Sequence, residues 1–321
     1  VLASSVAEGR HVRAAIVENK SGRGAIRAGC FIDASGDGDL AWSLGVASYD
    51  HGAARQAPSS GARFSGVDRI PGFRLNEELD RHGPEFGLGD DHGWWVDVPD
   101  APGLRMGLLS HVYGVDCSRA DDLTFAEMEG RSQVRAITRL VRQYSENGKA
   151  VGLAALASNI GIRETRHFRG LHTLREADLL AGRREPDAIA NGTYRVDIHQ
   201  GPENAGVVFR YLDGTEEFFG RRAGPCIRTR WKTDDSPCAT FYQVPYRTLV
   251  PAEYDNLLMA GRMIDADRGA FGAIRVMVNL NQLGEAAGVA AVESLDSGRP
   301  VRAIDTTRLR DRLRDGGSIL P

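Results

Sequence analysis

The sequence predicts an α/β protein that contains two strand–glycine–helix segments and, between them, a region of antiparallel strands. Two segments carry the first part of this prediction, since an apolar strand runs into glycine and then helix at residues 31–41 and again at 257–277. The second part comes from residues 194–250, where short apolar runs alternate with turn residues. The 321 residues are enough for about two domains with a buried core.

Residues 10–34 predict a β-hairpin, because Val12, Ala14 and Ile16 alternate with their neighbours and residues 19–22 have turn chemistry. The second arm is expected to reach residues 30–32. The chain opens without an initiator Met, as though structure were already under way, and a trimmed terminus explains this equally well. From residue 49 to about 114 the periodicity fades, which favours irregular loops and short strands.

Two Thr/Glu pairs indicate capping boxes. Thr124 with Glu127 predicts the start of a long helix that closes at 147–148, and Thr173 with Glu176 predicts a shorter helix. Strand-like runs of apolar residues then dominate the region from 194 to 250.

A short buried strand is expected at 257–260 and a long helix of small apolar residues from about Ile274 to Leu295. The glycines and alanines of this helix leave room for a backbone or a flat ligand. A last short helix has Asp305 as its expected cap.

Composition excludes several classes of function. The formal net charge is −3, from 40 Lys and Arg against 43 Asp and Glu, so no basic excess indicates a nucleic-acid partner. No apolar run approaches the roughly 18 residues of a membrane span. The four cysteines lack C-x-x-C spacing, and we expect a cytoplasmic protein.

The first candidate binding segment is the loop Gly36-Asp37-Gly38, which superficially opens a G-x-G-x-x-A motif between strand and helix. In that motif, backbone N–H groups and a helix dipole face a pyrophosphate. Two acids in the loop would repel phosphate, so Asp37 is expected to accept hydrogen bonds from hydroxyls or neighbouring amides. Ordinary strand–turn–helix geometry is an equally good explanation.

The second candidate follows the predicted strand at 257–260. Gly261-Arg262 leads into a loop containing Gly272, and the long helix is expected to begin at residues 273–276. The free N–H groups of that first turn would favour a negatively charged ligand. A buried helix packed on a sheet is the alternative interpretation.

The third candidate is the run Arg163-Glu164-Thr165-Arg166-His167. Its two guanidiniums could clamp an anionic or carbonyl substrate, with Glu164 orienting them or acting as a base; a salt-bridge network is the alternative. His199 could act as an acid or base, or serve a structural role. We expect no metal, because the histidines show no H-E-x-x-H spacing. His92 beside Asp90 and Asp91 could hold an ion, although a solvated loop fits better.

Four runs of sequence occur in a recognisable order: FIDASGDGDLAWSLGV at 31–46, GIRETRHFRGLHTL at 161–174, NLLMAGRMIDADRGAFGAIRVM at 256–277 and NQLGEAAGVAAV at 281–292. Together they resemble the FAD-dependent oxidoreductase family of the glutathione-reductase-like flavoprotein superfamily. The resemblance extends over nearly the whole chain.

The resemblance implies an incomplete FAD-binding, Rossmann-like domain at 1–48 and 250–298. An α+β substrate domain at 49–249 would interrupt it, and a helical tail would follow at 299–321. It also implies FAD as cofactor, with residues 36–39 on its AMP or pyrophosphate side and the amides of 273–276 at the flavin pyrimidine edge. The implied cofactor-binding residues are Gly36, Asp37, Gly38, Gly261, Arg262, Gly272, Ala273, Ile274, Arg275 and Val276.

One feature of the family is missing, namely the opening βαβ unit with G-x-G-x-x-G. We therefore expect a fragment, or one half of a split flavoprotein whose partner chain supplies that unit, and poor FAD affinity for the chain alone. The implied reaction is hydride transfer between a small polar organic substrate and flavin. Arg163 and Arg166 would position the substrate, and His199 or Glu164 would handle the proton. The alternatives are a non-catalytic subunit of a flavoprotein complex and an NAD-type dehydrogenase that uses residues 36–41.

Overall fold

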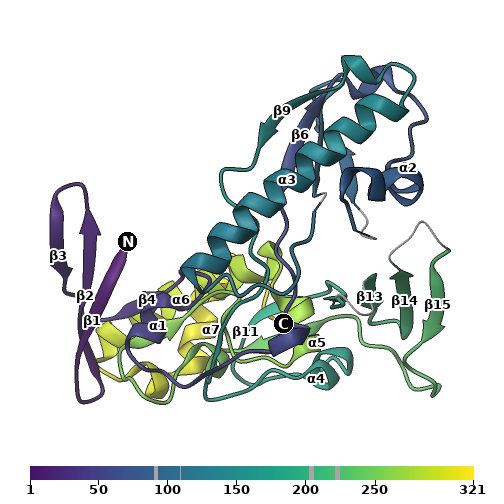
Figure 1. Ribbon diagram of the computed structural model, residues 1–321. Coiled ribbons are helices and arrows are strands. Elements are labelled where there is room, and N and C mark those ends of the chain that lie inside the picture. The colour runs from purple at the N-terminus through teal and green to yellow at the C-terminus, as the bar shows by residue number, and fades with distance from the viewer. Residues whose placement is uncertain (90–92, 109, 202–205, 221–224) are drawn as a thin grey trace.

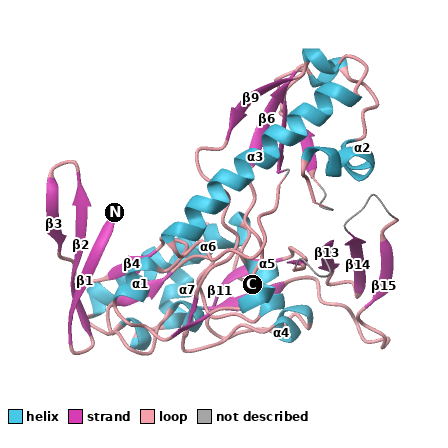
Figure 2. Ribbon diagram, viewed as in Figure 1, coloured by secondary structure: helices cyan, strands magenta, loops and turns pink. Residues whose placement is uncertain are grey.

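The computed structural model describes residues 1–89, 93–108, 110–201, 206–220 and 225–321. It has a broad base that contains the C-terminal helices, an arm built on the long helix α3 (Ala120–Tyr144), and an N-terminal hairpin that projects from one end of the base (Figure 1). Helices and strands are mixed throughout (Figure 2). None of the helices within these ranges has the length and apolar character needed to cross a membrane.

The N-terminal hairpin is a three-stranded antiparallel meander of β1 (Leu2–Glu8), β2 (His11–Asn19) and β3 (Gly22–Ile26). The expected turn is confirmed: Asn19 pairs with Gly22, and the Asn19 side-chain oxygen accepts a hydrogen bond from the Ser21 N–H at 2.8 Å. The second arm is shorter than expected, since it ends at Ile26. Strand β1 was not predicted.

A parallel pair of strands organises the base. Strand β4 (Phe31–Asp33) pairs with β17 (Leu257–Met259), with Phe31 opposite Leu257 and Asp33 opposite Met259. A helix follows each strand, α1 (Asp39–Ser43) after β4 and α5 (Arg268–Ile274) after β17. The carboxyl ends of both strands therefore lie at one edge, the place where open α/β sheets bind ligands.

The long C-terminal helix begins later than the sequence predicts. Residues 273–274 are the last turn of α5, and the long helix α6 runs over Met277–Ser297. Val276, in extended conformation, is the N-cap of α6. The break is held by Asn279, whose side-chain amide donates to the Ala273 carbonyl at 2.9 Å. Sequence periodicity runs through this junction and so misses it.

The two predicted capping boxes are wrong in detail, although both helices exist. Thr124 lies inside α3, where its hydroxyl donates to the Ala120 carbonyl at 2.9 Å, and Glu127 accepts from the Ile160 N–H instead. The second helix, α4 (Glu176–Leu180), has Arg175 as its N-cap, and the Thr173 hydroxyl donates to Asp265. Neither threonine therefore caps its helix: Thr124 lies within α3, and Thr173 binds the distant Asp265.

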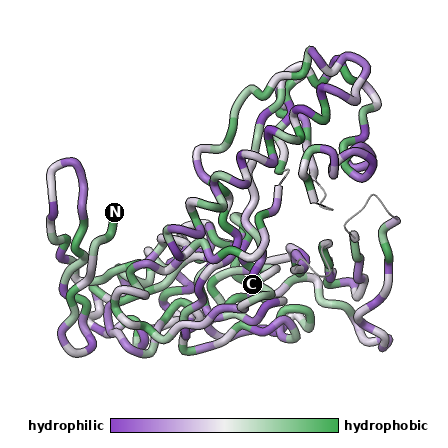
Figure 3. Tube along the Cα trace, in the orientation of Figure 1, coloured by the Kyte–Doolittle hydropathy of each residue, from purple (hydrophilic) through white to green (hydrophobic). Residues whose placement is uncertain are grey.

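The hydrophobic core divides differently from the predicted boundaries at 48/49 and 249/250. Residues 62–156 contain a core of their own between α3 and an antiparallel sheet of order β7-β8-β6-β9. Residues 174–250 instead share one core with 258–320. Hydrophobic and hydrophilic stretches alternate along α3, as expected for a helix buried on one face (Figure 3).

The remaining elements complete the arm and the base. A second antiparallel sheet has the order β12-β13-β14-β15, so the antiparallel expectation for residues 194–250 is confirmed. The bounds are β5 (Ser48–Tyr49), β6 (Gly61–Ser65), α2 (Leu75–His82), β7 (Trp94–Asp97), β8 (Arg105–Leu108), β9 (Gly152–Leu156), β10 (His167–Phe168), β11 (Ala188–Gly192), β12 (Val196–His199), β13 (Gly206–Arg210), β14 (Thr215–Gly220), β15 (Ile227–Arg230), β16 (Tyr242–Pro245) and α7 (Thr306–Asp315).

The C-terminal helix α7 packs into the main core through Leu309 and Leu313. Asp305 caps it as predicted, since its carboxylate accepts from the N–H groups of Thr307 and Arg308 at 2.9 and 3.2 Å.

We expect Asp305→Ala to lower the free energy of unfolding by about 1 kcal/mol, measured by urea denaturation. The control is Asp311→Ala on the same helix, which removes an exposed ion pair with Arg314 and should cost less than about 0.5 kcal/mol. Equal losses would contradict the capping role.

Candidate functional site

One short segment, residues 163–167, connects the parts of the site. It leads into β10, which pairs with β5. Neighbouring side chains of this segment contact different regions: Thr165 reaches the loop after β4, and His167 reaches the carbonyl of Ile264 beyond β17. The segment therefore holds together residues that are more than 90 positions apart in the sequence.

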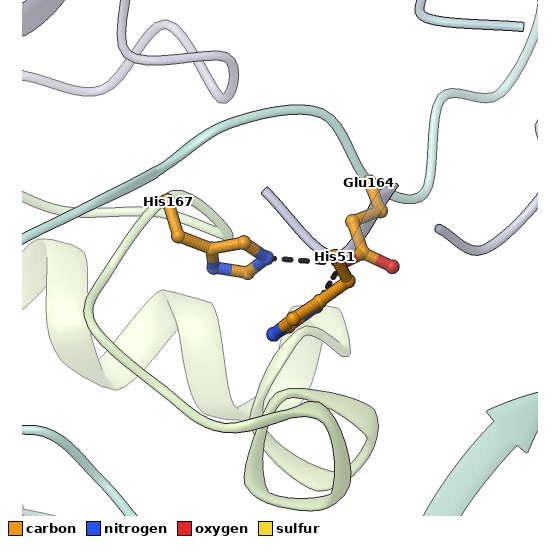
Figure 4. Close-up of side chains that lie close together, drawn as sticks. All are labelled: His51, Glu164 and His167. Atoms are coloured by element: carbon orange, nitrogen blue, oxygen red, sulfur yellow. Dashed lines mark hydrogen bonds and ion pairs between the residues drawn. The ribbon is translucent and has the colours of Figure 1, made fainter. Parts of the chain in front are cut away.

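Glu164 is buried at the centre of the segment. Its Oε1 lies 2.5 Å from Nδ1 of His51 and 3.1 Å from Nε2 of His167, and its Oε2 accepts from the Gln56 N–H at 2.8 Å (Figure 4). Burial opposes ionisation, but the hydrogen bonds with His167, His51 and the Gln56 N–H outweigh it and lower the pKa of Glu164 to about 2. A carboxylate this acidic is a poor general base, so the expectation that Glu164 accepts the substrate proton is not supported by its surroundings.

The loop after β4 and the residues after β17 meet, as the expected cofactor site requires. Asp37 Oδ1 accepts from the Arg262 guanidinium at 2.5 Å and from the Thr165 hydroxyl at 2.6 Å. Gly36 leaves room for this contact, because a Cβ at that position would lie 2.4 Å from Arg262 Nη1. The backbones approach closely too, since an ideal Cβ on Gly261 would be 3.7 Å from the Gly36 Cα. Gly36, Asp37, Gly261 and Arg262 thus form one cluster.

Two amides at the start of α1, those of Asp39 and Ala41, are already hydrogen-bonded within the strand–turn–helix unit. Asp33 accepts from the Ala41 N–H at 2.8 Å, and the Ser35 hydroxyl oxygen accepts from the Asp39 N–H at 2.9 Å. Gly38, the N-cap, has φ 69° and packs on Phe168. Asp33 at the end of β4 and Ser35 after it therefore bind two amides at the start of α1, a contact that both interpretations of the loop allow.

Gly272, Ala273 and Ile274 do not lie in the loop and first turn of the long helix, where they were predicted. All three lie inside α5, where Gly272, Ala273 and Ile274 are buried. Gly272 is small because β12 crosses it: a Cβ there would lie 2.7 Å from the Asp197 carbonyl oxygen. The first intrahelical bonds of α6 run from Asn279 and Leu280 to the Val276 carbonyl. The amides at the start of α6 that make no intrahelical hydrogen bond are therefore those of residues 276–278.

Arg163 and Arg166 do not converge on one anion. Nη1 of Arg163 binds the Ala57 carbonyl and the Ser59 hydroxyl, the latter at 2.6 Å. Arg166 donates to the Ser118 carbonyl at 3.1 Å, stacks over Trp42 and lies 3.6 Å from Asp39. The first arginine therefore fastens the segment, and the second faces the loop after β4.

His199 belongs to a second polar group, centred on the carboxylate of Asp197. His199 Nε2 lies 3.5 Å from Asp197 Oδ1, and Arg275 Nη2 lies 3.3 Å from the same oxygen. The Tyr194 hydroxyl donates to Oδ2 at 2.9 Å. Burial, followed by the charge of Asp197, raises the pKa of Tyr194 to about 12. The backbone N–H of His199 donates to the side-chain oxygen of Gln56 at 3.4 Å, and the backbone N–H of Gln56 donates to Glu164. Gln56 therefore connects this group to Glu164.

Several buried donors around the site fit a polyoxygenated anion such as FAD. Within the described residues, Nε of Arg262, Nε of Arg275 and the side-chain nitrogen of Gln56 are buried without a hydrogen-bond partner. Unmade hydrogen bonds of buried donors are costly, and a ligand with many acceptors would satisfy them. Gly36 and Gly261 add close access to the backbone.

Sequence reasoning missed the contacts of His51 and Gln56 with Glu164. His51 lies 113 residues from Glu164, and Gln56 lies 108 residues away, so no short motif could reveal these contacts. His167 belongs to the third candidate run, but its contact with Glu164 was not predicted. Asp90, Asp91 and His92 lie outside the described residues.

A parallel strand pair with glycine and a charged pair at its carboxyl edge is typical of proteins that bind a nucleotide cofactor. A model of the FAD dependent oxidoreductase family matches residues 1–313. The chain therefore belongs to the FAD-dependent oxidoreductase family, and its cofactor is FAD. No curated protein and no solved structure was found to match it.

Proposed function

We propose that the chain forms the larger part of a flavoenzyme that transfers a hydride between a small polar organic substrate and FAD. The observation that carries the proposal is the contact of Asp37 with Arg262 at the carboxyl edge of β4 and β17. When bound, FAD supplies the two-electron redox chemistry. The chain's own residues bind and orient the two reactants and hold the proton.

Arg262, Asp37 and the glycines beside them would hold the cofactor. The free Nε of Arg262 suits an oxygen acceptor, while Asp37 keeps its guanidinium in place. The amides of residues 276–278 at the start of α6 would favour negative charge on the ligand. Met277 and Val278 are exposed, so the buried core does not close this end of the helix.

His199 is the proposed proton donor or acceptor. Its ring nitrogen faces Asp197, a carboxylate that stabilises a protonated imidazole and fixes its orientation. Arg166 would orient an anionic or carbonyl group of the substrate, because its Nη1 is buried and without a hydrogen bond among the described residues. Arg163 would act only by holding residues 57 and 59 in place.

The proposal includes a partner strand. Phe31 and Asp33 bind residues 256 and 260 on the β17 side, so the backbone groups of Ile32 face the opposite edge of β4. The described strands provide no neighbour there. A parallel strand carrying G-x-G-x-x-G, from a partner chain or from sequence outside these 321 residues, would complete both the sheet and the anion site.

The cofactor role of Arg262 is tested by FAD titration, followed by flavin fluorescence quenching. Arg262→Ala should weaken FAD binding roughly ten- to a hundredfold, since a charged hydrogen-bond donor is worth about 1.5–3 kcal/mol. The matched control is Arg228→Ala, which removes an arginine–glutamate pair from β15. We expect the chain alone to be colourless as purified, because no FAD stays bound during purification, and to bind FAD when it is added in the titration. Unchanged affinity in Arg262→Ala would contradict the proposed site.

A non-catalytic subunit of a flavoprotein complex is the second candidate. This candidate is favoured if the chain and its partner bind FAD together but no small polar donor reduces the bound FAD. The NAD-type dehydrogenase is disfavoured, because the family match names FAD as the cofactor and two amides at the start of α1, those of Asp39 and Ala41, are already bonded to Ser35 and Asp33. A nicotinamide titration that gave a fluorescence change would reverse this judgement.

A further inference from the structure

His51, Glu164 and His167 bring two imidazole nitrogens and one carboxylate oxygen to within 4.8 Å of one another. They come from two places in the chain: His51 is the N-cap of a 3-10 helix at Gly52–Ala54, and Glu164 and His167 stand three residues apart in the segment that enters β10. Figure 4 shows both rings directed at the carboxylate. Glu164 and His167 are fully buried, whereas the His51 side chain is 16% exposed. The group is thus open on the His51 side.

The hydrogen bonds of His167 reveal an unusual contact. A carbonyl oxygen only accepts hydrogen bonds, so Nδ1 of His167, 3.1 Å from the Ile264 oxygen, carries the proton of the neutral ring. The lone pair of Nε2 then faces Glu164 Oε1 at 3.1 Å. Two acceptors at this distance repel each other unless a cation lies between them. That cation is either a proton, which makes a buried imidazolium, or a metal ion, which leaves the imidazole neutral.

The surroundings favour a metal-binding arrangement. The Ile264 carbonyl orients His167 as outer-shell acceptors orient metal-bound histidines, and the Gln56 N–H holds the second oxygen of Glu164. The His167 ring is fixed between Tyr49, stacked at 5.3 Å between centroids, and Phe271, edge-on at 4.7 Å. Two of the three ligands are therefore already positioned.

We propose that His51 Nδ1, Glu164 Oε1 and His167 Nε2 bind a divalent transition-metal ion. Two imidazoles and one carboxylate suit Zn²⁺ or Fe²⁺, and three protein ligands leave a position for water or a substrate oxygen. Ligands about 2.1 Å from such an ion stand roughly 3.4 Å apart in tetrahedral geometry. The Glu164–His167 pair is near that spacing, and the partly exposed His51 ring must move outward by roughly 1 Å.

The test is metal binding by the chelator-treated chain, independent of flavin chemistry. Isothermal titration with Zn²⁺ should give one saturable site, and Co²⁺ should give a visible d–d absorption band. His51→Gln should weaken Zn²⁺ binding at least roughly tenfold, and Glu164→Gln likewise. His82→Gln is the matched control, because His82 also contacts two carboxylates, Glu78 and Glu85, but on the surface; it should bind Zn²⁺ like the wild type.

Two outcomes would overturn the proposal. Absence of saturable Zn²⁺ binding would mean that a proton alone joins His167 to Glu164. Equal binding by wild type and His51→Gln would place any ion elsewhere. Circular dichroism of each variant checks that the fold is intact. His167 is not substituted, because its ring is part of the packing around Tyr49 and Phe271. Failure here leaves the FAD titration of Arg262→Ala unaffected, so the two proposals are separately testable.

Discussion

Gly38→Ala is expected to lower the free energy of unfolding by roughly 2–5 kcal/mol, one of the largest effects available from a single methyl group. Gly38 has φ 69° and ψ 39°, a left-handed conformation that costs other residues roughly 1–2 kcal/mol. Its Cβ would also lie 2.1 Å from Cε2 of Phe168. Phe168 is fully buried in the core that joins β4, α1 and β17, so the ring has no room to withdraw.

Gly45→Ala separates the two causes. Gly45 also has positive φ, 75°, but nothing lies within 4 Å of a Cβ placed there. The free energy of unfolding of Gly45→Ala should therefore fall only by the conformational cost of roughly 1–2 kcal/mol. Urea denaturation of both variants measures the difference, which reports the collision with Phe168. Similar losses for the two variants would show that the ring adapts, and the close packing argued for this loop would be wrong.

Asp265→Ala is expected to cost ~3 kcal/mol or more, because it leaves several buried donors without an acceptor. Asp265 is 1% exposed and accepts from the Tyr49 hydroxyl at 2.9 Å, the Thr173 hydroxyl at 3.0 Å and the Gly170 N–H at 3.2 Å. Arg169 lies 3.4 Å away. The carboxylate therefore fastens residues 169–173 and β5 to the loop after β17.

Asp265→Asn and Asp296→Ala are the companion variants. The amide keeps the shape but loses the charge, so Asp265→Asn should fall between wild type and alanine. Burial, and then the charge and hydrogen bond of Asp265, raise the pKa of Tyr49; in Asp265→Asn the phenol should ionise at lower pH in an ultraviolet titration. Asp296 is half exposed and forms an ion pair with Arg312, so Asp296→Ala should lower the free energy of unfolding by less than about 1 kcal/mol. A loss at Asp265 no larger than at Asp296 would refute its structural role.

Local patterns predicted the elements that depend on neighbours in sequence. The turn at Asn19–Gly22 and the buried strand at 257–259 are where their residue types place them. The cap of the last helix at Asp305 is confirmed as well. Patterns failed where a distant segment competes for the same side chain. Thr173 binds Asp265 rather than capping α4, and Asn279 closes α5 so that α6 starts three residues later than residue 274 suggests.

The candidate site divides along the same line. The family resemblance placed the loops at 36 and 261 at one cofactor, and the structure brings Asp37 and Arg262 into contact. The roles expected for residues 272–274 and for the paired guanidiniums of Arg163 and Arg166 could not be judged from spacing. A side chain's function depends on which way it points, and that direction is set by packing.

By itself, the sequence determined the family, the cofactor and the two strands whose ends form the site, because glycine and apolar runs act on the backbone locally. Only the tertiary structure decided that Glu164 would lie between His51 and His167. Those three residues come together through strand pairing of β5 with β10 and packing on α5, and the free energy of that assembly belongs to the whole core.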